Sequence, residues 1–202
     1  MKPQYLFILT LISVLIVSSL GTAQPSKERH SARGVSVVAR AAHETECGFG
    51  EIEVTANEIA TASSGRPVLE AEVSVVYSFY DFCEQVASYG AATSPLSDSL
   101  DMEHASFSFD FKFDRIRDTD PWEDGWVGTG TVEGSVTLIG VGEVRHANSV
   151  YQENDGHIHY AEWVRDAEAQ WTVTIDASPV ELVNATAHFR TFMDRALWST
   201  RE

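Results

Sequence analysis

The sequence predicts a mostly β domain, an antiparallel meander that closes as a barrel or a coiled sandwich and carries an α-helix at its C-terminal end. The clearest observation is a run in which phenylalanine occupies alternate positions, Phe107, Phe109, Phe111 and Phe113, with polar residues between them. Successive side chains of a strand point to opposite faces, so this run has one aromatic face and one polar face. Such a pattern is typical of an antiparallel sheet that is buried on one side and solvated on the other.

A second observation is the glycine-rich run 126–144 that follows. Its even positions are all apolar or glycine, and an antiparallel return beside the phenylalanine strand would set glycines against large rings. These 19 residues, if extended, would span roughly 60 Å, whereas a domain of this size is about 40 Å across. The run must therefore bend, and Gly140 and Gly142 are the expected places. A bent strand favours a barrel or a coiled sandwich over a flat sheet.

Shorter alternating runs predict the other strands, at residues 35–41, 51–55, 70–83, 145–152, 157–165 and 170–177, with a tight turn at 154–156. Residues 90–101, rich in Ser, Pro and Asp, are expected to be a loop. The period then changes. A capping box at 178–181, with proline at the first helical position, and an apolar stripe indicate a helix over 179–198. A strand over 183–191 is the alternative, because the apolar residues there also alternate.

The N-terminal residues 1–23 have the pattern of a secretory signal peptide. Lys2 supplies the positive charge and residues 6–17 the apolar stretch, ahead of a small-residue cleavage pattern. A transmembrane anchor is the alternative, but the apolar stretch is short for a membrane span. Residues 24–33 are polar and are expected to form a flexible lead-in. Residues 34–202 are then a single β-rich domain of a secreted protein, extracellular or periplasmic, without membrane contact after cleavage.

Charge and cysteine content restrict the partners and the compartment. Fourteen Lys and Arg against 30 Asp and Glu give a formal net charge of −16. Nucleic acids and anionic membranes favour a basic face, so neither is expected as a partner. Cys47 and Cys83 are predicted to form one disulfide in an exported chain, with two buried free thiols as the alternative. Asn184 begins an Asn-Ala-Thr sequon and would be glycosylated if the source modifies exported proteins.

Two histidines on one face of the predicted hairpin, His157 and His159, form a candidate metal site of a kind that β-sheets often carry. Asp155 could add a carboxylate. If Asp155 and Gly156 form the turn, Gln152 lies opposite His159, so the remaining ligands would come from another strand. A divalent metal held here is one hypothesis, and a pair of solvated surface histidines is the other.

The acidic connector after the phenylalanine strand is a second candidate site. Asp118, Asp120 and Asp124 could converge on a hard cation such as calcium, although their spacing is not that of an EF-hand. Solvated acids on a loop are the alternative. Trp122 and Trp126 at this connector could stack on a sugar ring or pack against the end of the sheet.

No catalytic motif is present in the sequence. The serines lie in no Gly-x-Ser-x-Gly context, and no phosphate-binding glycine loop precedes a helix. We therefore expect an exported, non-enzymatic binding module for a small ligand or a protein partner, with no cofactor apart from the hypothesised divalent metal. One alternative is a metal-assisted hydrolase or isomerase that uses His157 and His159. Another is a structural subunit of an envelope or matrix, which would expose a sheet edge.

Overall fold

One antiparallel sheet makes up almost all of the described chain. The computed structural model describes residues 27–63, 67–117, 125–153 and 156–199. Its strands are β1 (Lys27–Thr45), β2 (Gly48–Ser63), β3 (Val68–Asp81), β4 (Val86–Pro95), β5 (His104–Arg117), β6 (Trp126–Glu153), β7 (Gly156–Ile175), β8 (Ser178–Pro179) and β9 (Leu182–Ser199). These residues contain no helix, and thus none with the length and apolarity to cross a membrane.

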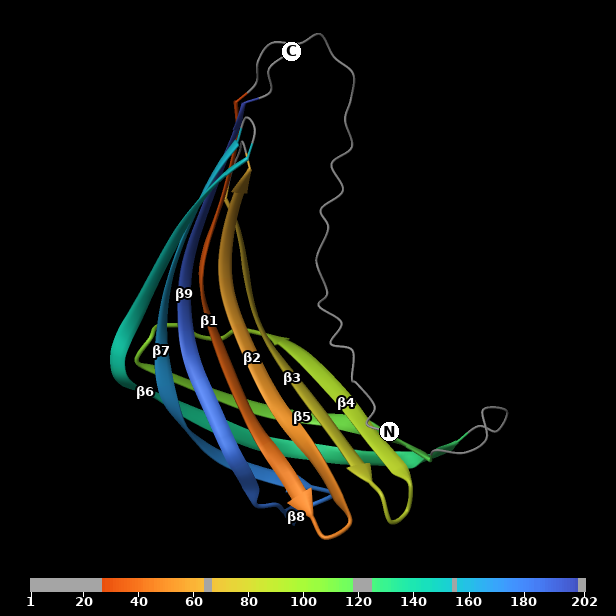
Figure 1. Ribbon diagram of the computed structural model, residues 1–202. Coiled ribbons are helices and arrows are strands. Elements are labelled where there is room, and N and C mark those ends of the chain that lie inside the picture. The colour runs from red at the N-terminus through yellow and green to blue at the C-terminus, as the bar shows by residue number, and fades with distance from the viewer. Residues whose placement is uncertain (1–26, 64–66, 118–124, 154–155, 200–202) are drawn as a thin grey trace, which may run out of the picture.

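The strand pairings run in a ring (Figure 1). The order is β6-β5-β4-β3-β2-β1-β9-β7, and β6 also pairs with β7, so the two ends of the order meet. Strands β1 to β6 each pair with the next strand in the chain, as the predicted meander requires, whereas β9 inserts between β1 and β7. The seam between β4 and β5 is short, because only residues 86–89 pair with residues 114–117.

The inner face of the ring is filled with side chains. Phe107, Phe109, Phe111 and Phe113 are between 2 and 8% exposed, whereas the residues between them are exposed. The aromatic face predicted from the alternation is therefore confirmed. These rings belong to one core with buried apolar residues of the other strands, among them Val37, Val54, Val75, Val136 and Phe189.

Glycines of β6 lie against the phenylalanine rings of β5, as the sequence predicts. Gly134 is paired with Phe109, and Gly130 is paired with Phe113. A Cβ atom on Gly130 would lie 2.2 Å from Cζ of Phe113, and one on Gly134 would lie 3.0 Å from the Phe109 ring. A side chain at either position would displace the ring, so glycine is needed here for the aromatic layer to pack.

The predicted bend lies within β6. The pairing with β7 shifts between Val141 and Arg145, and Gly142 has a φ of +70°, a left-handed conformation that favours glycine. Figure 1 shows β6 crossing the lower part of the molecule and then turning upward along its left-hand side. The runs 126–144 and 145–152 are thus one strand of 28 residues. The runs 157–165 and 170–177 likewise belong to one strand, β7.

Beyond the bend the sheet continues as an open arm, the upper part of the molecule in Figure 1. Pairing between β5 and β6 ends at Ile139, and pairing between β4 and β3 begins only at Glu72. Six strands therefore continue without β4 and β5, in the order β6-β7-β9-β1-β2-β3. We define the arm as residues 145–153, 156–164, 190–199, 27–35, 58–63 and 68–71 of these strands.

The loop between β4 and β5, residues 96–103, crosses the ring between the core and the arm. At one wall, the Leu100 N–H donates to Oε2 of Glu58 on β2 at 2.8 Å. At the other wall, the Gly140 N–H of β6 donates to the Glu103 carbonyl, also at 2.8 Å. Apolar side chains of this loop pack against the core. The loop therefore closes the core on the side that faces the arm.

The helix predicted over residues 179–198 is wrong. The chain there forms β8 and β9, and β9 pairs with β1 on one side and with β7 on the other. Phe189 is fully buried on the inner face, whereas Phe192 of the predicted stripe belongs to the opposite face. Asn184 has a φ of +54° near a register shift with β1, and this irregularity breaks the alternation at the start of the strand. Backbone pairing on both edges outweighs a local capping pattern.

Two further expectations differ from the structure. Residues 27–33, predicted within the lead-in, belong to β1, and residues 30–33 pair with both β2 and β9. Residues 90–95, predicted as loop, belong to β4, whose small Ala, Gly and Ser residues give a weak hydrophobic pattern. The predicted signal peptide lies outside the described residues.

Candidate functional site

Five rows of paired residues on β1, β9 and β7 lead from the open end of the arm to the core. In that order the rows are Arg29–Leu197–His157, Ser31–Arg195–His159, Arg33–Met193–Ala161, Val35–Thr191–Trp163 and Val37–Phe189–Arg165. Val37 and Phe189 are core residues, so all five rows lie on the face that is buried inside the ring. In the arm, beyond the ring, the same face is open. We call this open surface the trough. Rows on one face are about 6.7 Å apart, so the first four span about 20 Å.

The open end of the trough is basic. Arg29 and Arg195 are exposed there, and with His157 and His159, also exposed, they line a hollow of about 650 Å³. Arg195 is paired with Ser31 on one side and with His159 on the other, so the guanidinium and imidazole groups share one face. Cationic and hydrogen-bonding groups therefore dominate this end.

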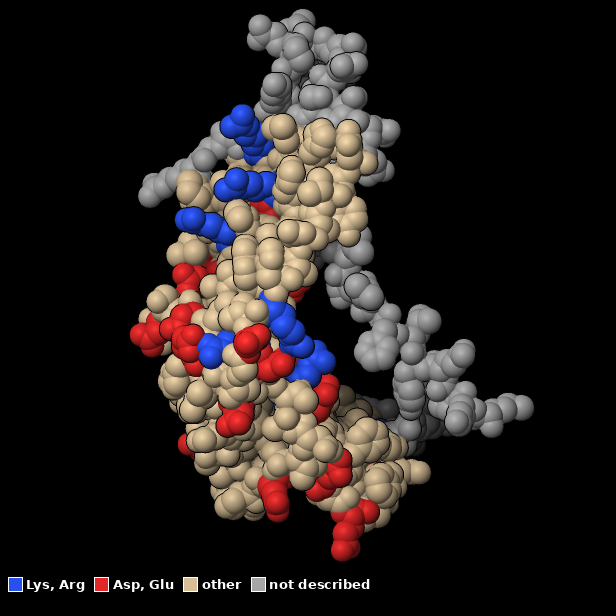
Figure 2. Space-filling view, turned by 60° about the vertical axis from the view of Figure 1, so that its left-hand side comes forward, with Lys and Arg blue, Asp and Glu red and all other residues tan. Residues whose placement is uncertain are grey.

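Among the described residues, the trough arginines lack the carboxylate partners that five other arginines have. The arginines that form an ion pair with an Asp or Glu are Arg40, Arg115, Arg145, Arg165 and Arg190. Within the described part of the chain, Arg29, Arg33 and Arg195 form no such pair. In Figure 2, basic side chains stand out in the upper part of the molecule and acidic ones in the lower part. The trough arginines thus concentrate positive charge in a chain of net charge −16.

The next part of the trough is apolar. A second hollow, of about 670 Å³, adjoins Arg33 and is lined by Val35, Leu69, Trp163 and Met193 among others. The Trp163 ring stacks on the His146 ring of β6, with 4.9 Å between the ring centroids. This stacking holds the indole in the wall of the hollow.

The inner end of the trough carries charged groups that already have partners within the molecule. Arg165 Nη1 lies 2.5 Å from Oε1 of Glu103, and Glu58 accepts the hydrogen bond from the Leu100 N–H. Arg33 and Glu58 both line the apolar hollow, where their opposite charges offset each other, so the net positive charge lies at the open end. A ligand with an anionic head at the open end and an apolar chain directed inward would match both parts. Guanidinium groups donate paired hydrogen bonds to carboxylates and phosphates, and each hollow has the volume of a small-molecule site.

The structure gives His157 and His159 a cationic neighbour rather than further metal ligands. His159 lies opposite Arg195 on β9 and Val150 on β6, whereas Gln152 lies opposite His157. The expected pairing of Gln152 with His159 is wrong because Glu153 pairs with Gly156, which shifts the register from the one assumed. A guanidinium group beside the imidazoles repels a divalent cation. Among the described residues, no acid or thiol joins these histidines in a cluster that could hold a metal.

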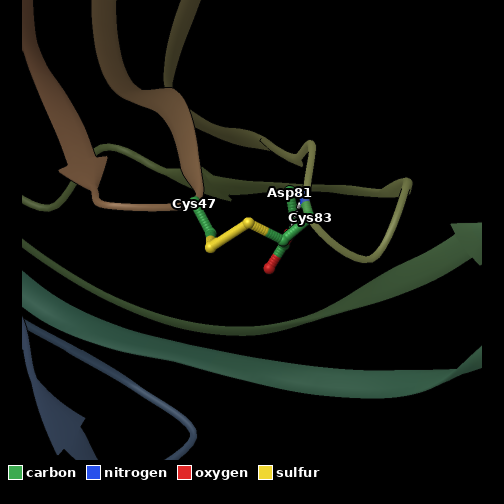
Figure 3. Close-up of side chains that lie close together, drawn as sticks. All are labelled: Cys47, Asp81 and Cys83. Atoms are coloured by element: carbon green, nitrogen blue, oxygen red, sulfur yellow. Dashed lines mark hydrogen bonds between the residues drawn. A yellow bond between two sulfur atoms is a disulfide. The ribbon is translucent and has the colours of Figure 1, made fainter.

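The cluster of potential metal ligands that the described residues do contain is Cys47, Asp81 and Cys83 (Figure 3). Cys47 and Cys83 form a disulfide, which confirms the predicted pair, so neither offers a thiolate to a metal. Asp81 Oδ1 accepts hydrogen bonds from the backbone N–H groups of Cys83 and Glu84, both at 2.9 Å. This cluster is therefore structural, and it ties the β1–β2 turn to the β3–β4 turn.

Several other predicted site residues, Asp118, Asp120, Trp122, Asp124 and Asp155, lie outside the described residues. Trp126 is exposed at the start of β6, and its Nε1 donates to Oδ1 of Asp114 at 3.5 Å. Asn184 is exposed near the irregularity of β9, with its Nδ2 3.5 Å from Oε1 of Glu44. The sequon therefore lies on the surface.

Sequence reasoning missed the trough arginines. The sequence suggests a flexible lead-in around Arg29 and Arg33 and a helix around Arg195, so nothing in it brings the three together. The one local signal is the spacing of Arg29, Ser31 and Arg33, which share a face if the segment is a strand. The position of Arg195 depends on the register between β1 and β9, which no local pattern contains.

No protein-family model matches this chain, and searches of the curated proteins and of the solved structures find no match either. The function is therefore inferred from the surfaces of the molecule itself.

Proposed function

We propose that this chain is an exported, non-enzymatic binding protein whose ligand is an amphipathic anion, a molecule with a carboxylate or phosphate head and an apolar chain. The observation that carries the proposal is the set of arginines that no described carboxylate neutralises and that share one face with an apolar hollow. The head would contact Arg29 and Arg195. The chain would lie against Met193 and Trp163, where burial removes its surface from water.

The proposal includes a closed and filled barrel. The ring of pairings, the buried phenylalanines and the loop across the ring all support it. In such a barrel the ligand binds in the arm and not among the phenylalanine rings. Export is proposed from the signal-like N-terminus, and a Cys47–Cys83 disulfide is compatible with an oxidising compartment.

Binding fits the trough better than catalysis. A histidine that acts as a general base is usually oriented by a carboxylate or carbonyl within hydrogen-bond reach. Across the strands, the described neighbours of His157 and His159 are Gln152, Leu197, Val150 and Arg195. None of these is an acid, so the imidazoles are suited to contact an anionic head rather than to move a proton.

Isothermal titration calorimetry of the full chain with decanoate, the neutral decan-1-ol and acetate tests the proposal. The two decyl compounds share the apolar chain and differ in head charge, whereas acetate has the head without the chain. We expect decanoate to bind at least about tenfold more tightly than either, a difference of about 1.4 kcal/mol. Equal affinities for decanoate and decan-1-ol would mean that the head charge is not recognised, and the proposal would fail.

Two matched arginine variants test the location of the site. Arg195→Gln removes a trough guanidinium, whereas Arg145→Gln removes one on the outer face of the arm that pairs with Asp166 at 2.6 Å. Both remove one positive charge from an exposed position. We expect Arg195→Gln to weaken decanoate binding about tenfold, because a hydrogen bond to a charged group contributes about 1.5–3 kcal/mol. We expect a change of less than about twofold for Arg145→Gln. Equal weakening by both would contradict a head site in the trough.

A further inference from the structure

A third hollow, of about 740 Å³, lies on the outer face of β2, β3 and β4, at the end of the sheet away from the arm. Two adjacent rows of outward-facing residues form it, Phe49–Tyr80–Ala87 and Glu51–Ser78–Tyr89. The small residue is on β4 in the first row and on β3 in the second, so each lies next to a large ring of the other row. The small residues Ser78 and Ala87 leave the space that the three rings and the carboxylate surround.

The rings around this hollow are available to a ligand. Phe49 is 64% exposed and Tyr89 is 59% exposed, while Tyr80 is partly buried. The ring contacts found in the described part of the chain include none between two of these residues. These rings therefore do not stack on one another, and their faces can contact a ligand. Exposed apolar clusters of this kind mark interaction sites more often than isolated exposed residues do.

Carboxylates border the hollow. Glu51 lines it, Glu44 lies beside Phe49 in the register of β1 and β2, and Asp114 lies beside Tyr89 in the register of β5 and β4. All three acids are exposed. The described residues of these two rows include no Lys or Arg. One row further, Arg40 pairs with Glu53 at 2.5 Å, and Lys112 lies between Asp110 and Asp114 on the same face of β5. The potential at the hollow is therefore negative.

We propose that this hollow binds an organic cation of the quaternary-ammonium class. The electron-rich face of an aromatic ring attracts a cation, and a weakly hydrated quaternary ammonium loses little by leaving water. The surrounding carboxylates complement its charge and exclude an anion. A hard metal ion needs several oxygen ligands at short range, whereas Glu51 is the one acid among the residues that line the hollow. This site does not depend on the trough, which has the opposite charge and the opposite position.

Choline and 3,3-dimethylbutan-1-ol are suitable probes, because they have nearly the same shape and differ in the charge of the central atom. We expect choline to bind the full chain at least about fivefold more tightly than the neutral alcohol, as followed by calorimetry. Equal affinity for the two probes would overturn the proposal, and so would a failure of choline to saturate the protein. Decanoate should not compete with choline, so failure of one site is distinguishable from failure of the other.

Matched variants separate the rings from the overall acidity of the chain. Tyr89→Leu keeps an apolar side chain but removes the ring, and Tyr151→Leu makes the same change at an exposed tyrosine of the arm. We expect choline binding to weaken at least about fivefold in the first and to stay unchanged in the second. Glu51→Gln and the exposed control Glu143→Gln each remove one negative charge. Weakening by Glu143→Gln equal to that by Glu51→Gln would show a general effect of net charge and would overturn the assigned site.

Discussion

His43 couples the buried core to pH. Its ring is buried beside the Phe79 ring, with 4.7 Å between the centroids, and its Nδ1 lies 3.2 Å from the Tyr77 hydroxyl. Burial lowers the pKa of His43 below its ordinary value of 6.5, because the charged imidazolium is poorly solvated there. Burial also raises the pKa of Tyr77, so its hydroxyl stays protonated and can donate to the neutral imidazole.

Acidification should therefore destabilise the fold through His43. Below pH 6.5 the unfolded chain binds a proton at this residue that the folded chain does not, since the folded pKa is lowered. The contribution of His43 is complete above pH 6.5 and is lost as the pH falls from 6.5 toward the folded value. We expect the free energy of unfolding in urea to fall as the pH is lowered from about 6.5 to 5.5, and to fall less in His43→Leu. Identical pH dependence in the two proteins would exclude this role.

The phenylalanine rings make the largest individual contributions that the sequence allows us to predict. Phe109 is buried against Gly134, so truncation removes ring contacts and leaves a cavity. We expect Phe109→Ala to lower the free energy of unfolding by about 3–5 kcal/mol, measured by urea denaturation. Val150→Ala, at a position that is 62% exposed, should change it by less than about 0.5 kcal/mol. A near-neutral Phe109→Ala would mean that the aromatic face is not the core.

At the level of elements, strands were predictable where one local pattern decided the structure. The alternation in β5 and the glycines of β6 each indicate which face is buried, and both are confirmed. The C-terminal segment was not predictable, because a capping box and a helical stripe coincide with a strand that has an irregularity at Asn184. Hydrogen bonds to β1 and β7, distant in sequence, decide its conformation. The sequence therefore predicts local alternation better than it predicts which segment fills a gap in the sheet.

The disulfide links two neighbouring turns rather than two positions of one hairpin, so it stabilises the arrangement of the strands that these turns connect. Cys47 and Cys83 are separated by 36 residues, and closing a loop of that length in the unfolded chain contributes about 3–4 kcal/mol. We expect the double variant Cys47→Ser/Cys83→Ser to unfold at lower urea concentration by a corresponding amount. The same loss should follow reduction of the unmodified protein. A double variant as stable as the oxidised protein would show that the disulfide does not contribute to the free energy of unfolding.

At the scale of the whole molecule, opposite charges occupy opposite ends of one sheet. The arm presents Arg29, Arg33 and Arg195 without described acidic partners, whereas the outer face near the disulfide presents exposed carboxylates among aromatic rings. Neither surface could be predicted from the sequence, because each is assembled by the register of three or more strands. The sequence does contain the necessary residues at alternate positions, but the pairing of distant strands brings them together.

The most direct test of the central claim is to observe the ring signals of His157 and His159 by NMR during titration with decanoate. Both residues line the basic hollow with Arg195, so a carboxylate bound there should shift their signals in a saturable way. His157→Gln and His159→Gln variants assign the two signals. We expect the buried His43 signal to stay in place, because the ligand binds in the arm and not in the core. Shifts at His43 without shifts at His157 and His159, or no saturable shift at all, would contradict an anion-binding trough.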